Sequence, residues 1–212
     1  MKFDFLLSQI QGITDQSLPG HKAHDDILPV LAQQRKNAFQ RDPNPRQSSV
    51  AATLFPLTDG EAHILLIERQ SYDGVHSGQI GFPGGKVEAT DKTLVDTALR
   101  EMEEEVGVLR ANPMLIRSIS EVYIPPSRFL VHPFLFYLNE LPSLVKNERE
   151  VEKIIFFPIS KLLDDKTVVH GKIRLDNGVF IKTPYFEHEG YQIWGATAMM
   201  LSEIKWMLRG VV

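Results

Sequence analysis

Hydrophobic residues between Val95 and Val106 recur at the spacing of one face of an α-helix. The apolar stripe lies beside polar and charged positions and consists of Val95, Ala98, Leu99, Met102 and Val106. Thr93 with Asp96 forms a capping-box pattern, Asp91 is an alternative cap, and Gly107 supplies a left-handed stop. The pattern therefore predicts an amphipathic helix that packs this stripe on a hydrophobic core.

Strand patterns precede this helix. Residues 48–57 and 62–69 predict two strands around a Thr58-Asp59-Gly60 turn, which is typical of a hairpin. A short apolar stretch at 79–82 predicts a further strand, and Pro83-Gly84-Gly85 follows it as a turn that lets backbone approach a ligand closely. Because helical and strand patterns alternate, we expect an α/β fold with a mixed sheet covered by helices.

The N-terminal region has a different character. We predict helices near residues 4–10 and 25–38, after which Asp42-Pro43-Asn44-Pro45 breaks the chain. The expected organisation is a single domain, 1–212, with a helical leader at 1–45 and the core at 46–212. The sequence leaves open whether the leader packs on the core or on a second subunit, as in a homodimer.

Composition narrows the class of protein. The 212 residues are 43% hydrophobic, enough for one domain with a sizeable core. A net charge of −4 argues against a nucleic-acid partner, and the absence of cysteine excludes disulfides and thiolate catalysis. The chain has neither an apolar run of membrane-spanning length nor a secretory signal, so we expect no membrane partner and a cytoplasmic location.

Four carboxylates crowd the C-terminal end of the predicted helix, namely Glu101, Glu103, Glu104 and Glu105. Acids are disfavoured there because a helix C-terminus carries partial negative charge, and Glu101 and Glu105 also form a like-charge i,i+4 pair. A solvated acidic helix end is the plain alternative. A bound divalent cation would instead reverse the sign of every one of these interactions.

Helical geometry separates the four acids. At about 100° per residue, Glu101, Glu104 and Glu105 share one side of the helix, whereas Glu103 points away. Arg100 lies next to Glu104, suited to hold a carboxylate by a charge-assisted hydrogen bond. Hard oxygen donors without His or Cys favour Mg²⁺ or Mn²⁺ over zinc or copper.

The glycine turn and the acidic helix together resemble the signature of the Nudix hydrolase family. The matching positions are Gly85, Asp91, Arg100, Glu101, Met102, Glu104, Glu105, Gly107 and Val108. Two features depart from the signature, since Asp91 replaces the usual Glu and the spacer from it to Arg100 is eight residues rather than seven. Both departures fall at the start of the helix, so we expect a shifted loop rather than lost chemistry.

Upstream residues resemble the coenzyme A pyrophosphatase branch of this family. The branch marker is matched by Leu65-Leu66, Arg69, Gly78-Gln79-Ile80 and Phe82 to Gly85, but Asp73-Gly74 stands where the branch usually has Leu-Arg. The resemblance continues more loosely through residues 126–133, 150–158 and 194–198. It implies a Nudix-type α/β/α sandwich, with a strand entering a short helix after Glu150 and a closing helix after Trp194.

The resemblance also implies the site. Glu101, Glu104 and Glu105, with the Gly85 carbonyl, would hold Mg²⁺ or Mn²⁺. Glu104 or a loop acid would accept the proton of the attacking water, with Arg100 supporting the carboxylates. The candidate loop acids are Glu148, Glu150, Glu187 and Glu189, of which Glu150 best fits the branch pattern.

Candidate substrate contacts are basic residues and the glycine loop. They are Arg69, Gly84, Lys86, Arg128 and His76, with His188 as a further loop candidate. A surface role is the alternative for Lys86, Arg128 and His76. We expect Tyr191 and Trp194 in the core rather than as a shelf for adenine, and His21 and His24 on the surface.

The predicted function is metal-dependent hydrolysis of a small nucleotide substrate like coenzyme A, giving 4′-phosphopantetheine and adenosine 3′,5′-bisphosphate. The same catalytic helix is compatible with hydrolysis of ADP-ribose, NADH or another nucleoside diphosphate derivative. A non-catalytic, effector-binding module on the same scaffold is the second alternative. Such modules usually lose members of the acid set, and all three remain here.

Overall fold

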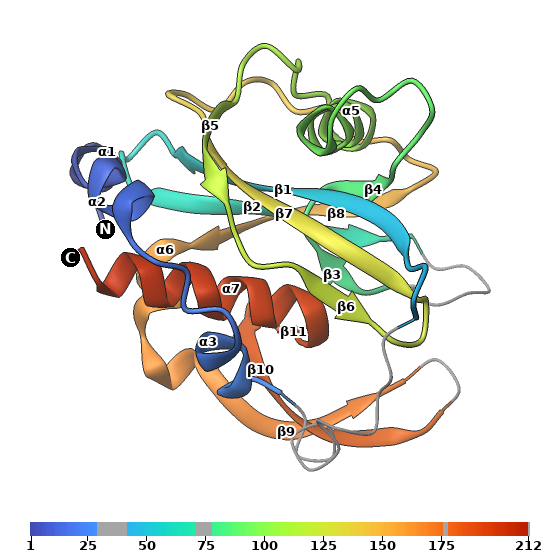
Figure 1. Ribbon diagram of the computed structural model, residues 1–212. Helices are drawn as coiled ribbons and strands as arrows, with labels where there is room; N and C mark the ends of the chain where they lie inside the picture. The colour runs from blue at the N-terminus through green and yellow to red at the C-terminus, as the bar shows by residue number, and fades with distance from the viewer. Residues whose placement is uncertain (29–41, 71–77, 176–177, 212) are drawn as a thin grey trace.

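The computed structural model describes residues 1–28, 42–70, 78–175 and 178–211 (Figure 1). The helices are α1 (Phe3–Ser8), α2 (Ile10–Asp15), α3 (His21–Asp25), α5 (Leu94–Val106), α6 (Ile159–Leu163) and α7 (Gly195–Arg209), with a 3₁₀ turn at Asp165–Thr167. The strands are β1 (Arg46–Pro56), β2 (Ala62–Arg69), β3 (Ile80–Gly81), β4 (Gly84–Lys86), β5 (Met114–Ser118), β6 (Val122–Ile124), β7 (Phe129–Tyr137), β8 (Val151–Pro158), β9 (Val168–Arg174), β10 (Phe180–His188) and β11 (Tyr191–Ile193).

Within the described ranges, β1 to β8 form a mixed sheet. β1 runs parallel to β7 and antiparallel to both β2 and β4, while β2 pairs with β3 and β8. The segment 80–86 therefore pairs first with β2 and then with β1. β9, β10 and β11 form a second, antiparallel sheet.

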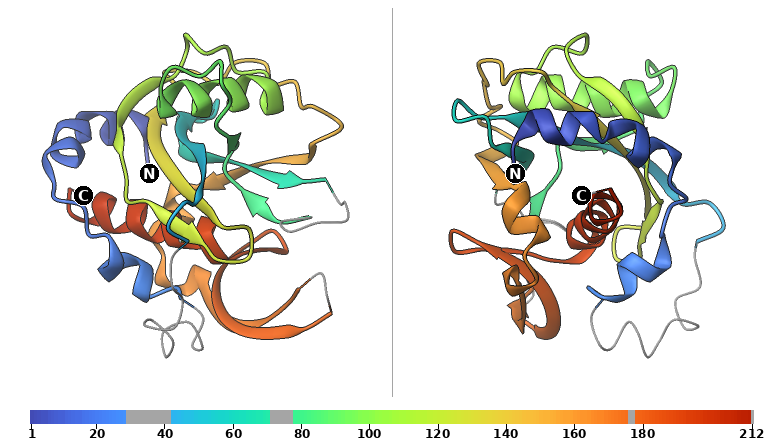
Figure 2. Two further views of the ribbon diagram at one scale, coloured as in Figure 1. Left: turned by 45° about the vertical axis from the view of Figure 1, so that its right-hand side comes forward. Right: turned by 90° about the vertical axis from the view of Figure 1, so that its left-hand side faces the viewer.

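Helices cover both faces of the larger sheet. α5 lies on one face and α7 on the other, as Figures 1 and 2 show from three directions. Residues of β2 alternate between the two cores, with Leu65 and Ile67 packed in the α5 cluster and Ile64 and Leu66 in the α7 cluster. This arrangement confirms the expected α/β sandwich with a mixed sheet.

Most local predictions are confirmed. The hairpin pairs Leu54 with Ile64 and Pro56 with Ala62 around the predicted turn. The strand predicted at 79–82 is shorter and covers Ile80–Gly81, and Gly84 and Gly85 of the predicted turn belong to strand β4, which pairs with β1. β8 leads directly into α6, and α7 begins immediately after Trp194.

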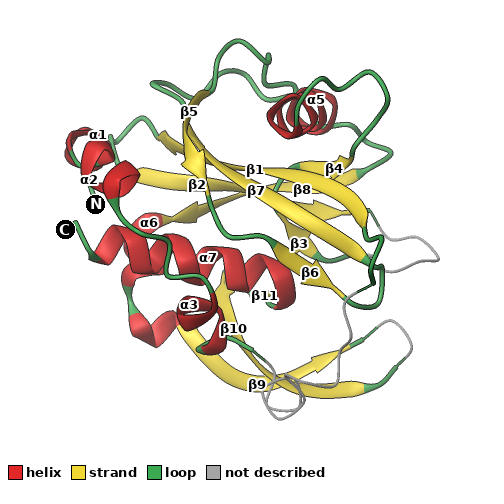
Figure 3. Cartoon of the chain, viewed as in Figure 1, coloured by secondary structure: helices red, strands yellow, loops and turns green. Residues whose placement is uncertain are grey.

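The leader follows its prediction less closely. The helix predicted near residues 4–10 is divided into α1 and α2, which meet at Gln9. Most of the helix predicted near 25–38 lies outside the described residues. The described part packs on the core, since Gln16 of the segment after α2 donates to the Met207 carbonyl of α7 at 3.1 Å (Figure 3).

The prediction for His24 was wrong. His24 is only 2% exposed, and its Nε2 lies 2.9 Å from Oε2 of Glu203 on α7. These partners are 179 positions apart, so local sequence gave no signal for the contact. Among the described residues, no helix is both long and apolar enough to cross a bilayer.

Candidate active site

The helix that carries the acids begins and ends as its sequence predicts. Thr93 Oγ1 accepts from the Asp96 N–H at 3.1 Å, and Asp96 accepts from the Thr93 N–H at 2.9 Å, which completes the capping box. Gly107 ends the helix with φ of 77°. Ala98, Met102 and Val106 are fully buried against the sheet. This packing fixes the rotation of α5 and therefore the direction of each carboxylate.

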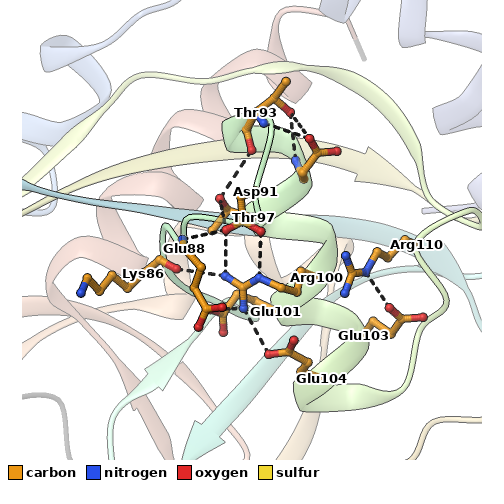
Figure 4. Close-up of polar contacts among 11 residues, drawn as sticks. Lys86, Glu88, Asp91, Thr93, Thr97, Arg100, Glu101, Glu103, Glu104 and Arg110 are labelled. Atoms are coloured by element: carbon orange, nitrogen blue, oxygen red, sulfur yellow. Dashed lines mark hydrogen bonds and ion pairs between the residues drawn. The ribbon is translucent and has the colours of Figure 1, made fainter.

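Arg100 is the centre of a polar network beside this packing (Figure 4). Its Nε and Nη2 donate to the two oxygens of Asp91 at 2.9 and 3.0 Å, and its Nη1 donates to Glu101 at 2.9 Å and Glu104 at 3.1 Å. Nη2 also donates to the Lys86 carbonyl at 3.0 Å. One buried guanidinium therefore ties the loop before α5 to two acids of the helix.

Asp91 is held in its ionised form. Hydrogen bonds from Arg100 keep the pKa of the Asp91 carboxyl far below its usual range, and the Glu88 N–H and the Thr97 hydroxyl also donate to it. The same pairing raises the pKa of Arg100 above its usual range. Asp91 is therefore the anchor of Arg100, whereas the sequence placed it in a shifted loop or at the helix cap.

Glu105, unlike Asp91, is disfavoured as an anion. Its side chain is only 1% exposed, and its hydrogen-bond partners only partly compensate for the burial of its charge. Burial raises the pKa of its carboxyl to about 7, against the opposing effects of Arg69 and of the Gly84 N–H. The Gly84 N–H donates to Oε2 at 2.8 Å, and Arg69 Nη1 donates to Oε1 at 3.2 Å. The like charges of Glu101 and Glu150 add to the rise.

The glycine loop leaves room only for the acid that faces it. A Cβ on Gly85 would lie 2.5 Å from the carboxylate atoms of Glu101, and a Cβ on Gly84 would lie 2.4 Å from the Ser49 carbonyl oxygen. Gly84 also has a φ of +154°, which side chains rarely adopt. Gly85 therefore leaves the space that the Glu101 carboxylate occupies, whereas Gly84 allows β4 to lie close to the backbone of β1.

Glu101 itself is disfavoured as an anion. Burial raises the pKa of its carboxyl, because hydrogen bonds from Arg100 only partly replace the lost water, and the charges of Glu104 and Glu150 add to this effect. Glu103 points away, as predicted, and pairs with Arg110 at 2.6 Å. Figure 4 shows these two residues on the far side of the helix from Arg100.

These residues fit a hard divalent cation by their chemistry. Carboxylate oxygens from α5 face a glycine loop, and a cation would favour the ionised forms of Glu101 and Glu105 that burial disfavours. In the parts of the chain that the structure describes, no three His, Asp or Glu side chains form a ready metal cage. Glu101 and Glu104 turn toward Arg100, and Glu105 turns toward Arg69.

Of the residues predicted to contact substrate, some lie in the acidic site and others lie at the surface. Arg69 lies inside the acidic site and donates to the Gly84 carbonyl at 2.6 Å, while the Lys86 side chain is exposed and leads away from Arg100 (Figure 4). Arg128 is mostly exposed, has a φ of 55° and pairs with Asp42 at 3.4 Å. His76 lies outside the described residues. His188 packs on Phe157 with ring centroids 5.2 Å apart.

The candidate loop acids also differ in how near they lie to the acidic site. Glu150 adjoins the site, because its charge acts on both Glu101 and Glu105, and its carbonyl accepts from the Gln70 N–H at 2.9 Å. Glu148 is exposed nearby and pairs with Lys146. Glu187 and Glu189 belong to the β10–β11 hairpin instead, in the second sheet. Their roles, like those of the other site residues, stay predictions.

Two contacts of the site were not expected from the sequence. The Asp91–Arg100 pair joins residues on either side of the helix cap, and the Arg69–Glu105 pair joins the end of β2 to the end of α5. Only the first had a usable signal, since an acid at a fixed distance before Arg100 was part of the motif. The second depends on how α5 sits on the sheet.

Comparisons with known proteins identify the family of the chain. The NUDIX domain family matches residues 47–176. Nudix hydrolase 15, mitochondrial, of Arabidopsis thaliana is 31% identical over 199 residues, covering 89% of this chain and 67% of the plant protein. The human mitochondrial coenzyme A diphosphatase NUDT8 is 32% identical over 155 residues, covering 71% of this chain and 65% of the human protein.

Solved structures show the same fold. A MutT/nudix family protein from Enterococcus faecalis aligns with a TM-score of 0.50 at 15% identity, over 93% of this chain and 71% of that one. The MutT protein from Methanosarcina mazei Go1 aligns with a TM-score of 0.50 at 17% identity, over 77% of this chain and 95% of that one.

The chain belongs to the Nudix hydrolase family. This membership defines a pyrophosphohydrolase of nucleoside diphosphate derivatives, a class that generally uses divalent metal ions.

Proposed function

We propose that this protein hydrolyses the pyrophosphate bond of coenzyme A or its derivatives, with Mg²⁺ or Mn²⁺ as cofactor. The observation that carries the proposal is that Glu101 and Glu105 of α5 face Gly84 and Gly85 of β4, with Glu104 beside them on Arg100 and Arg69 at the edge. Support for the substrate comes from the marker residues around this turn and from the similarity to the human coenzyme A diphosphatase.

The residues have distinct tasks in this reaction. Glu101, Glu104 and Glu105 would hold the divalent ion with the Gly85 carbonyl, and the ion when bound supplies Lewis-acid polarisation of the phosphoryl oxygens. Arg100 keeps two of these carboxylates in place, and Asp91 keeps Arg100 in place. Arg69 carries positive charge at the glycine turn, where it would offset that of the diphosphate.

Glu104 is the proposed acceptor of the water proton. Its side chain is 51% exposed, so it reaches solvent while Arg100 fixes one of its oxygens at 3.1 Å. Glu150 is the proposed loop acid that would assist it, since its charge acts on the neighbouring Glu101 and Glu105. Attack of water on one phosphorus breaks the bridging P–O bond and leaves 4′-phosphopantetheine and adenosine 3′,5′-bisphosphate as products.

The test of the mechanism is Glu104→Gln. We expect kcat for coenzyme A to fall by about 10³-fold with an unchanged circular dichroism spectrum, the range seen when a key electrostatic group is removed. Glu103→Gln is the matched control, because Glu103 is a neighbouring acid that pairs with Arg110 away from the site. Near-normal turnover by folded Glu104→Gln protein would remove Glu104 from the mechanism.

The test of the substrate is product identification by mass spectrometry in ¹⁸O-labelled water, with Mg²⁺ or Mn²⁺. We expect both coenzyme A products, with the label in one of them, and no turnover after chelation of the metal. ADP-ribose and NADH are compared under the same conditions. An equal or higher rate on ADP-ribose would overturn the assignment of coenzyme A as substrate. The proposed catalytic role of the α5 acids would then still stand.

A further inference from the structure

A cavity of about 250 Å³ lies on the face of β2 opposite the acidic site. Its wall combines residues of β2, of the segment that enters β3, of β9 with its following turn, and of β11 with the residues on either side. They are Glu68, Gly78, Gln79, Ile80, Ile173, Arg174, Leu175, Gly190, Tyr191, Gln192 and Trp194. Tyr191 and Trp194, expected in the core, are half-buried; Tyr191 packs against the core, and both also line this space.

The cavity and the acidic site share their supports. Glu68 lines the cavity and Arg69 pairs with Glu105, so adjacent residues of β2 serve the two faces. Ile80 is four residues before Gly84, which limits the chain between them to about 14 Å. Thr197 of α7 donates to the Ile80 carbonyl at 2.9 Å, which fixes the helix that follows Trp194 against β3.

The chemistry of the wall matches a nucleotide. Tyr191 and Trp194 contribute aromatic side chains to the wall, and Glu68 contributes a carboxylate. Aromatic side chains are the groups that stack on a planar base, and a carboxylate can accept from an exocyclic amine. Arg174 is an exposed cation on the same wall, and Lys153 holds its Nζ 5.6 Å from the centre of the Tyr191 ring. Lys153 is also paired across the sheet with Glu68, so both lie on this face.

The size of the cavity fits part of a substrate. Pockets that enclose a drug-sized ligand typically measure about 300–1,000 Å³, so this space suits a base with its sugar rather than a whole dinucleotide-like molecule. From these observations we infer that the cavity binds the adenine nucleoside end of the substrate, with Arg174 facing its sugar phosphate. The inference rests on the proposed function, since it places the diphosphate of the same molecule near Arg69.

Fluorescence can test binding without turnover. The chain has two tryptophans, and Trp206 lies 12 residues along α7 from Trp194, about 18 Å away. In a Trp206→Phe protein, Trp194 is the one tryptophan reporter. We expect adenosine 3′,5′-bisphosphate to quench it in a saturable manner without added metal, and no saturable quenching would overturn the inference.

Two variants locate the ligand. Arg174→Gln should raise the dissociation constant of adenosine 3′,5′-bisphosphate about tenfold, through loss of a charge-assisted contact. Lys172→Gln is the matched control, because this exposed lysine is on the same strand and lines a different cavity. Trp194→Leu, checked by circular dichroism, should raise KM for coenzyme A about tenfold with little change in kcat, through loss of stacking.

Kinetics separate this inference from the proposed function. Adenosine 3′,5′-bisphosphate should inhibit competitively against coenzyme A, whereas non-competitive inhibition would overturn a shared substrate site. Wild-type KM in the Trp194 and Arg174 variants would reject the cavity and leave the proposed hydrolysis standing. Saturable quenching of Trp194, weakened about tenfold in Arg174→Gln, with no hydrolysis of coenzyme A would reject the proposed substrate and retain the cavity as a nucleotide site.

Discussion

At the scale of single residues, the site depends on where charges are held and on where side chains are missing. Arg100 holds Asp91, Glu101 and Glu104 at once, and Arg69 holds Glu105 together with the Gly84 carbonyl. The positive charges of two arginines therefore offset the mutual repulsion of neighbouring carboxylates. Gly85, opposite, leaves the space that the Glu101 carboxylate occupies.

Gly85→Ala tests this requirement for space. The added Cβ would lie 2.5 Å from the Glu101 carboxylate, so that side chain must move away from the loop. We expect kcat/KM to fall by about 100-fold, the effect of misplacing a group by roughly 1 Å, together with weaker activation by Mn²⁺.

Gly81→Ala is the control for this change. Its Cβ would meet Thr197 Oγ1 at 3.9 Å, an ordinary contact, and Gly81 lies on the neighbouring strand. Steady-state kinetics across a Mn²⁺ titration check both variants. Normal Mn²⁺ activation and turnover in Gly85→Ala would show that Glu101 does not need its place beside the loop.

At the scale of elements, α5 is held by its ends and by one buried stripe. The capping box satisfies backbone groups at its start, and Gly107 ends it in a conformation that few other residues adopt easily. The acids near its C-terminus act against the helix dipole. The element is therefore kept helical by packing and caps, which leaves its last turns available for function.

Thr93→Ala removes one half of the capping box. We expect the free energy of unfolding to fall by about 1 kcal/mol, which lowers Tm by roughly 2–4 °C for a chain of this size. kcat/KM should stay near the wild-type value, because the Thr93 hydroxyl bonds to Asp96 rather than to the acidic site. Calorimetry and kinetics measure the two effects, with exposed Thr90→Ala as control. An unchanged Tm would contradict the stabilising role of the cap.

At the scale of the whole molecule, a buried polar cluster joins the leader to the core. Glu203 of α7 is 0% exposed and accepts hydrogen bonds from the Ser120 hydroxyl at 2.7 Å and the Ser120 N–H, with His24 of α3 at 2.9 Å. Burial by itself would raise the pKa of Glu203. The bonds from His24 and Ser120 outweigh it and lower the pKa below the ordinary value of 4.5.

Glu203→Gln should therefore lower the free energy of unfolding by about 1–3 kcal/mol at pH 7. Because the folded-state pKa is depressed, this stabilisation is present above the unfolded pKa and is lost as pH falls through the folded one. The difference from wild type should accordingly shrink below about pH 4.5. Urea denaturation at pH 7 and at pH 4 measures it.

Asp165→Asn is the control for this prediction. Asp165 also pairs with residues of α7, Lys205 and Arg209, but its side chain is 77% exposed. Its loss should change the free energy of unfolding by less than about 1 kcal/mol. A Glu203→Gln protein as stable as Asp165→Asn would show that the buried cluster does not secure the leader.

The sequence by itself determined the features that local rules govern. Alternation and turn residues located the β1–β2 hairpin, and the capping box with Gly107 gave the limits of α5. The helical period also predicted that Glu103 points away from the other acids, and its pairing with Arg110 agrees with this prediction. These features needed only the geometry of one helix or one turn.

Tertiary structure decided every feature that joins distant segments. His24 is buried with Glu203, 179 residues away, as its partner, and Arg69 at the end of β2 meets Glu105 of α5, 36 residues away. Tyr191 and Trp194 look like core residues in the sequence, yet β9 and β11 leave a cavity beside them. A local sequence pattern predicts which side chains share a face of an element. Only the packing between elements determines what that face contacts.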